Sequence, residues 1–341
     1  MTALNLHPPL PSAEALGIAG LAFRTFRGEV DYPLMLEVIE ESKKADRAEW
    51  STSVEDIARD YSHLRNCDPK TDMIFALIDG RPIGYGRTGW EDERKGDRIL
   101  FLFVNLVPAW RGKGIRAAMV RWLEDRARAV AEANPTNKTK IYQTWMSEHE
   151  QDAIRVFTEA GYEPARWEYE MIRSLDEPIA DAPLPEGIEL RPVTDADAPQ
   201  VFAAANEAFI DHWGETDWFT PKSLDEWRKG PTYDPSIWKI AFDGDEVVGT
   251  VMNYVHKKEN QEYGRQRGYT ESICVRKAWR GRGIAKALIT ESMRMHKAMG
   301  MTEVCHGVDT QNPTGALQLY EGLGYRPHKR EYAYRKPMRT G

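Results

Sequence analysis

The sequence predicts an α+β fold, of the α/β sandwich-like kind, that is built twice along one chain of 341 residues. One observation is the string Trp-Arg-Gly-x-Gly-Ile, which begins at Trp110 and again at Trp279. Another is a set of landmarks that recur at offsets of 163 to 169 residues: Phe23 with Leu190, Asp79 with Asp243, Arg111 with Arg280, and Gly161 with Gly324. Four landmarks in the same order at nearly constant spacing indicate two copies of one domain.

Each copy reads as two helices, a hairpin, a strand, a long helix, a strand, a helix and a last strand. The hairpins are marked by Asp79-Gly80 and Asp243-Gly244, because Asp-Gly between apolar runs is a strong turn signal. Three prolines between 174 and 187 disfavour helix and central strand there. We therefore expect a loose arm at 1–19, a first domain at 20–173, a linker at 174–187 and a second domain at 188–341.

Bulk properties exclude several classes of protein. The net charge of −7 and a pI near 5.7 disfavour an obligate nucleic-acid binder. No apolar run reaches the roughly 18 residues of a membrane helix, and the N-terminus lacks the basic and apolar segments of a signal peptide. The three cysteines are far apart, and no His/Cys spacing resembles a metal site. We expect a cytoplasmic protein without a disulfide framework, a metal, a membrane or a nucleic-acid partner.

The stretch from Arg280 to Ala285 carries the clearest chemical signal. It follows a strand-like run at 269–275 and opens a helix with apolar residues at helical spacing. Glycines allow close approach of the backbone, and the unpaired amides of a first helical turn bind anions. The pattern predicts a phosphate cradle, although a plain turn from strand to helix is an alternative. After the next strand, 302–308, Asn312 and Pro313 predict a helix start, and Gly324 its end.

These motifs resemble the GCN5-related N-acetyltransferases. The glycine signature of that family is met by Arg280, Gly283 and Ala285, and its later pattern by a second set: Asn312, Ala316, Tyr320, Gly324 and Tyr325. The resemblance covers nearly all of 188–336 and, more weakly, 20–173. It implies two tandem domains of this family, each a mixed, mostly antiparallel twisted sheet flanked by helices.

The resemblance implies acetyl-coenzyme A as the cofactor of the second copy. The cofactor-binding residues expected from it are those of the cradle, of the strand that pairs with the pantetheine arm, and of the last helix: Arg280, Gly281, Arg282, Gly283, Ile284, Ala285, Lys286, Ile273, Cys274, Val275, Asn312 and Tyr320. As a phenol that stays protonated at neutral pH, Tyr320 can also donate a proton to the thiolate. An aromatic core residue is the alternative interpretation of Tyr320.

Glu271 is the candidate general base, since related enzymes carry a base on this strand. By the period of two it should share a side with Ile273 and Val275. The alternative is a strand glutamate that faces solvent. Candidate substrate contacts come from the aromatic segment after the first helix of the second copy and from its hairpin: Asp211, His212, Trp213, Asn253 and Tyr254.

The first copy departs from the family pattern at three positions. Arg116 stands where Gly or Ala belongs, His149 replaces the asparagine and Phe157 replaces the tyrosine. We therefore expect a catalytically degenerate first copy and an active second one, in a monomer or a homodimer. The expected reaction is direct acetyl transfer to a small-molecule primary amine. The alternatives are a module that binds acyl-CoA without turnover and a transferase that uses aminoacyl-tRNA.

Overall fold

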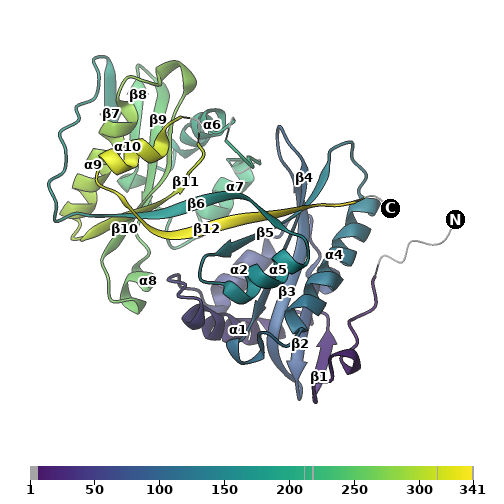
Figure 1. Cartoon of the computed structure of the whole chain (residues 1–341). Helices are drawn as coiled ribbons and strands as arrows, with labels where there is room; N and C mark the ends of the chain where they lie inside the picture. The colour runs from purple at the N-terminus through teal and green to yellow at the C-terminus, as the bar shows by residue number, and fades with distance from the viewer. Residues whose placement is uncertain (1–6, 211, 217–218, 313, 340–341) are drawn as a thin grey trace. The chain divides into compact units, whose positions relative to one another are not determined.

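The computed structural model describes residues 7–210, 212–216, 219–312 and 314–339, and these form two compact units. One unit contains the chain up to Arg166 together with Glu331–Gly341, and the other is the continuous segment Trp167–Arg330. Figure 1 colours the chain by residue number, from purple at the N-terminus to yellow at the C-terminus. They do not coincide with the two sequence copies, because each unit takes its last strand from the other copy.

The first unit is built around the strands of the first copy. Its strands run in the order β1-β2-β3-β4-β5, with the end of β12 antiparallel to β5 through Glu331–Pro337. β4 and β5 are parallel, and the other neighbours pair antiparallel. The strands are β1 (Leu21–Arg24), β2 (Met73–Ile78), β3 (Arg81–Asp92), β4 (Arg98–Leu106), β5 (Lys140–Ser147) and β12 (Arg326–Pro337).

Helices cover this sheet and close its core. The long α4 packs on β2, β3 and β4, and α1 packs on β3 and β4. Ser53 caps α2, because its side chain accepts from the Asp56 amide. The helices are α1 (Tyr32–Ala45), α2 (Val54–Ser62), α3 (Pro69–Asp72), α4 (Ile115–Ala133) and α5 (Gln151–Glu159).

The second unit repeats the arrangement. Its strand order is β6-β11-β10-β9-β8-β7, and only β10 and β11 pair in parallel. The sheet is therefore mixed and mostly antiparallel, as expected. The strands are β6 (Glu163–Ser174), β7 (Ile188–Arg191), β8 (Lys239–Asp243), β9 (Glu246–Tyr254), β10 (Arg267–Val275) and β11 (Glu303–Asp309).

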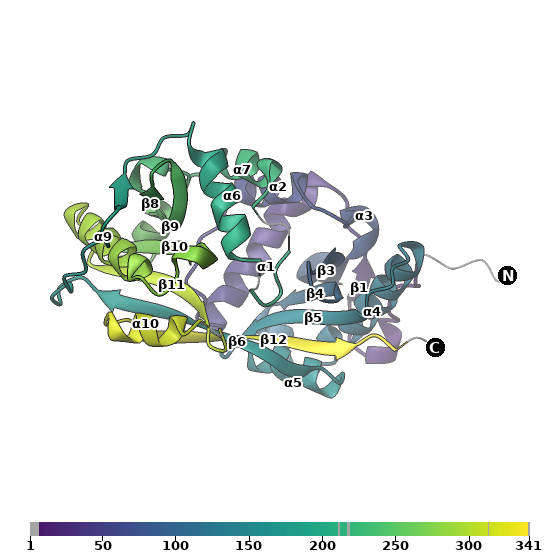
Figure 2. The same ribbon diagram turned by 90° about the horizontal axis from the view of Figure 1, so that it is seen from above.

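Two apolar cores lie on opposite faces of this second sheet. On one face α9 and α10 pack over a cluster that includes Val251, Leu288 and Tyr325. On the other face α6 and α7 pack over Trp238 and Met252 (Figures 1 and 2). The helices are α6 (Ala198–Ala208), α7 (Pro221–Trp227), α8 (Lys257–Glu262), α9 (Ile284–Ala298) and α10 (Ala316–Gly322).

Beyond Ser174, which ends β6, the expected linker 174–187 contains no helix or strand but is held in place by the second unit. Arg173 donates to the carbonyls of Ser174, Glu177 and Pro178, and Lys297 donates to that of Leu175 at 2.6 Å. Leu175 is itself buried in the core. This segment therefore packs as part of the unit, and the units divide instead at 166/167 and 330/331.

No helix formed by the described residues is long and apolar enough to cross a membrane.

Candidate active site

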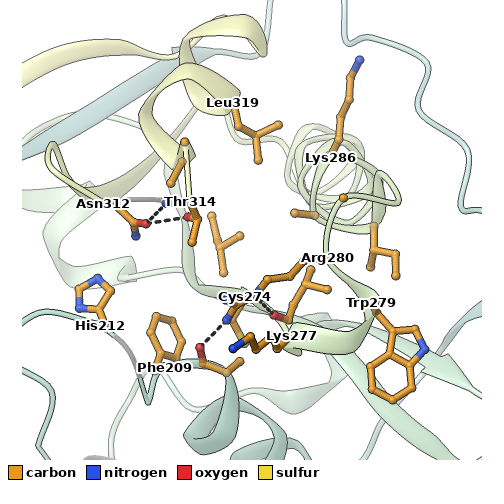
Figure 3. Close-up of a pocket in the computed structure, with 18 of the residues that line it drawn as sticks. Phe209, His212, Cys274, Lys277, Trp279, Arg280, Lys286, Asn312, Thr314 and Leu319 are labelled. Carbon is orange, nitrogen blue, oxygen red and sulfur yellow. Dashed lines mark hydrogen bonds between the residues drawn. The ribbon is translucent and has the colours of Figure 1, made fainter. Parts of the chain in front are cut away.

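A cavity of about 600 Å³ lies in the second unit, where β10 meets α9 and α10. Its lining combines the glycine turn, the end of β10, the start of α10 and the residues after α6 (Figure 3). Eleven of the twelve expected cofactor residues line it: Ile273, Cys274, Val275, Arg280, Gly281, Gly283, Ile284, Ala285, Lys286, Asn312 and Tyr320. The twelfth, Arg282, is exposed and does not line the cavity.

The glycine turn is shaped to leave backbone amides open. Gly281 and Gly283 have φ of 77° and 86°, in the left-handed region that favours glycine, and an added Cβ at either would meet no atom within 4 Å. Gly283 is the N-cap of α9, so the amides of the first turn of α9 have no partner within the helix. The turn thus offers donors and open space to an anion.

Arg280 has a different role from the one that its charge suggests. Its Nε donates to the Val275 carbonyl at 2.9 Å, and its Nη2 donates to the Ala208 carbonyl at 2.9 Å. The guanidinium therefore ties the end of β10 to the end of α6 (Figure 3). Lys277 and Lys286 also line the cavity and are exposed, so positive charge surrounds the open amides.

A β-bulge in β10 opens the sheet beside the cavity. Three residue steps from Glu271 to Cys274 face two steps on β9, and Ser272 has a φ of 50°. The buried Thr250 hydroxyl donates to the Ser272 carbonyl at 2.7 Å and lies 3.1 Å from the Cys274 sulfur. The extra residue frees part of the β10 backbone from the ladder, as pairing with an extended arm would require.

The bulge corrects the predicted direction of Glu271. Ile273 and Val275 pack against the core under α9 and α10, whereas Glu271 pairs with Met252, which belongs to the opposite core. The period of two fails here because the bulge inserts a residue between Glu271 and Cys274. Glu271 consequently lies on the face covered by α6 and α7 and does not line the cavity.

The environment of Glu271 favours its neutral form. Burial raises the pKa of this carboxyl to about 8, and the nearby Glu168 and Glu170 act in the same direction. A hydrogen bond from the Gly307 amide opposes the shift. A carboxyl with a pKa near neutrality can both accept and release a proton under ordinary conditions.

Tyr320 reaches the cavity from α10. The residue is 6% exposed, and among the described residues no side chain or backbone group hydrogen-bonds its hydroxyl. Burial, with Glu271 and Cys274 nearby, raises the pKa of the phenol above its usual value of 10.0. Tyr320 is thus both a core residue and a residue of the cavity, and its phenol remains protonated.

His306 is a neighbour that the sequence analysis did not assign to the site. Its ring centroid lies 3.9 Å from that of Tyr320 and 4.3 Å from that of Tyr325. Burial lowers the pKa of His306 to about 3, so the imidazole is neutral. The alternation in β11 and the aromatic helix α10 could have suggested this contact, but nothing in the sequence gives the ring geometry.

Asn312 does not cap the last helix as predicted. α10 begins at Ala316 after Gly315, and Asn312 Oδ1 instead accepts from the Thr314 amide at 2.9 Å (Figure 3). Asn312 lines the cavity from this turn. Pro313, the predicted first helical residue, lies outside the described residues.

The expected substrate contacts divide into several groups. His212 and Trp213 line the cavity. Asn253 is fully buried, donates to the Ile237 carbonyl and to Ser292 Oγ, and does not line the cavity. Tyr254 stacks on Tyr269 with centroids 4.7 Å apart, outside the cavity lining. Asp211 lies outside the described residues.

Other chemistries find little support in the described part of the chain. Burial raises the pKa of the Cys274 thiol to about 11, which keeps it protonated and poorly nucleophilic. The described residues contain no group of three or more His, Cys, Asp or Glu side chains that could hold a metal ion.

The corresponding turn of the first copy is filled by the protein itself. Arg116, which aligns with Ala285, is buried, pairs with Asp152 at 2.8 Å and donates to the Val104 carbonyl. Asp152 also accepts from the Gly112 amide at 3.1 Å. The Asp152 carboxylate thus accepts from the amide of Gly112, which aligns with Gly281 in the second copy. The Arg116 guanidinium covers the Val104 carbonyl, which aligns with that of Ile273.

Comparisons with known proteins find domains of one family in both halves of the chain. Two family models match, one described as "Acetyltransferase (GNAT) family" at residues 35–162 and one as "Acetyltransferase (GNAT) domain" at 234–327. A mycothiol acetyltransferase of Streptomyces scabiei is 32% identical over 49% of this chain and 52% of its own length. One of Salinispora arenicola is 27% identical over 87% of this chain and 91% of its own. The chain thus spans about half the length of the first of these relatives.

Solved structures share the fold over nearly the whole chain. A GCN5-related N-acetyltransferase from Sphaerobacter thermophilus is 26% identical, with a TM-score of 0.73 and 98% coverage of both chains. A tandem GNAT protein from the clavulanic acid biosynthesis pathway has a TM-score of 0.68 at 13% identity, covering 94% of this chain and 99% of that one.

Proposed function

The chain belongs to the GNAT acetyltransferase family, and from this premise we propose that it transfers an acetyl group from acetyl-coenzyme A to a small-molecule primary amine. The observation that carries the proposal is the cavity in which open amides, a bulged strand and the Tyr320 hydroxyl come together. The residues present fit the cofactor: the turn offers donors to a pyrophosphate, and the bulge offers backbone to the pantetheine arm.

The proposed mechanism assigns one proton to each of two side chains. Glu271 accepts the proton that the acceptor ammonium must lose, because an amine with a lysine-like pKa of about 10.4 is mostly protonated at pH 7. The amine nitrogen bonds to the acetyl carbon as the carbon–sulfur bond breaks. Tyr320, protonated and open to the cavity, donates to the departing thiolate. The acetylated nitrogen then loses its second proton, which restores the Tyr320 phenol by way of solvent, and Glu271 releases its own proton to solvent.

Catalysis is proposed for the second copy alone. In the first copy, Arg116 and Asp152 fill the turn, and Phe157 replaces Tyr320. Phe157 is buried and packs edge-on against Tyr162, so it offers no donor. These contacts support one cofactor site per chain.

The experiment that tests the proposal is release of free thiol from acetyl-CoA in the presence of a panel of primary amines. We expect amine-dependent thiol release together with the acetylated amine in the mass spectrum. Binding of acetyl-CoA without release by any amine would instead indicate a binding module. Retention of aminoacyl-tRNA by the protein, without thiol release from acetyl-CoA, would indicate the other alternative from the sequence.

A further inference from the structure

Gly307 leaves an opening in the middle of β11 on the face of the sheet that carries Glu271. The glycine is exposed, and a Cβ built on it would meet no atom within 4 Å. Its backbone is not in the left-handed region, so conformation does not require glycine there. A glycine inside a strand often marks a place where a ligand comes close to the backbone.

Two carboxylates border this opening on neighbouring strands. The Gly307 amide hydrogen-bonds the Glu271 carboxylate on β10. On the side of β11 away from β10, Gly307 pairs with Glu170 of β6, and directly paired residues point to the same face of the sheet. The proposed general base and Glu170 therefore lie on either side of the opening.

Most of the nearby cations have closer partners than Glu170. Arg267 lies 3.6 Å from Glu170 but pairs with Glu303 at 2.7 Å. Arg265 pairs with Glu259 at 2.6 Å, and His328 is 3.9 Å from Glu170. Among the ion pairs of the described residues, Glu170 thus makes only the longer contacts with Arg267 and His328, so an ammonium group beside it gains a charge-assisted hydrogen bond.

We propose that the space over Gly307 is the acceptor pocket and that Glu170, with Glu271, holds the acceptor as an ammonium ion. This deepens the proposed function and rests on it. The substrate class is a primary amine without a carboxylate near the nitrogen, since a second anion would meet like charge. Glu170 precedes 174, so a residue of the first sequence copy determines the specificity of the second.

The test compares 3-aminopropan-1-ol with β-alanine, which share a chain length but differ in an alcohol or a carboxylate. We expect kcat/KM for the amino alcohol to exceed that for β-alanine at least about tenfold. In Glu170→Gln this ratio should fall, and kcat/KM for the amino alcohol should drop about tenfold, as expected for loss of an interaction of 1.4 kcal/mol. The KM for acetyl-CoA should not change.

A second variant fills the space without removing charge. Gly307→Val suits a strand and places two methyl groups in the opening, so the acceptor KM should rise about tenfold or more. Gly322→Val is the matched control, because Gly322 is also open but lies on exposed α10 surface away from the cavity. Acetyl-CoA binding by calorimetry verifies that each variant is folded.

The outcomes separate the two proposals. If no amine in the full panel is acetylated, the proposed function fails. If amines are acetylated but both variants keep the wild-type acceptor KM, or if β-alanine is the better substrate, the pocket over Gly307 is contradicted while the proposed function stands.

Discussion

At the scale of single residues, we propose opposite proton transfers for Tyr320 and Glu271 because their environments differ. Tyr320 lies among apolar core residues and next to a neutral imidazole, so its phenol keeps its proton. Burial, and after it the nearby Glu168 and Glu170, raises the pKa of the Glu271 carboxyl to about 8. Tyr320 thus suits the role of acid and Glu271 that of base, and the two side chains come from opposite faces of the second sheet.

Tyr320→Phe should lower kcat by about 10²–10⁴-fold, the usual contribution of general acid catalysis. The substitution removes one hydroxyl that no described residue hydrogen-bonds, so core packing and acetyl-CoA affinity should be nearly unchanged. Steady-state kinetics with calorimetry tests this. Phe157→Tyr in the first copy is the control and should add no activity while Arg116 fills the turn. Full kcat in Tyr320→Phe would remove the assignment.

The raised pKa of Glu271 predicts the pH dependence of the reaction. The base must be deprotonated, so kcat/KM should rise with pH through an apparent pKa near 8. In Glu271→Gln this step should vanish and leave only the titration of the amine. If kcat/KM of Glu271→Gln still rises through an apparent pKa near 8, the titration belongs to another group.

The same shift predicts an effect on stability with a definite sign. The folded state holds the Glu271 proton more tightly than the unfolded state, in which the pKa of this carboxyl is near its usual value of 4.5. Stability from this group is therefore complete below about pH 4.5 and is lost as pH rises through about 8. Glu271→Gln should raise Tm relative to wild type at pH 9 and not at pH 4, as measured by calorimetry.

At the scale of elements, the bulge in β10 sets the geometry of the site, and Thr250 holds the bulge. Thr250→Val keeps the side-chain shape but loses the bonds to Ser272 and Cys274. We expect a loss of about 1–3 kcal/mol of stability and weaker acetyl-CoA binding. Thr290→Val is the matched control, since its buried hydroxyl bonds the Ala287 carbonyl within α9. Equal effects of both variants on binding would contradict the role of the bulge.

The element scale also shows what the sequence could and could not predict. The strand, turn and helix around Gly281 and Gly283 were confirmed because glycines and apolar spacing are local signals. The direction of Glu271 was wrong because a bulge depends on the neighbouring strand. The start of α10 was wrong because the Asn312 side chain bonds a local turn in place of the helix. The burial of Asn253 depends on α9, which is distant in sequence.

At the scale of the whole molecule, each unit takes its last strand from the other sequence copy. The strand β6 lies beside β11 in the second unit although it ends the first sequence copy. No pattern within one strand reveals which sheet it joins, because both copies have the same alternation. The second sequence copy alone therefore lacks a strand of its own unit.

This exchange predicts an unusual pair of fragments. Residues 163–330 form a continuous segment that contains the second unit, and we expect this fragment to fold and to bind acetyl-CoA. Residues 188–341 follow the sequence repeat but lack β6, and we expect them to aggregate or remain unfolded, because the edge of β11 is left unpaired. Circular dichroism and calorimetry distinguish them. A well-folded 188–341 fragment that binds acetyl-CoA would contradict the structural role of β6.

The central claim is that one cofactor site per chain lies at the turn of the second copy. Calorimetric titration of the intact protein with acetyl-CoA tests it most directly. We predict a stoichiometry near one, abolished by Ala285→Arg, which places in the second turn the arginine that fills the first, and unchanged by Arg116→Lys. Two equivalent sites, or one site that survives Ala285→Arg, would contradict the claim.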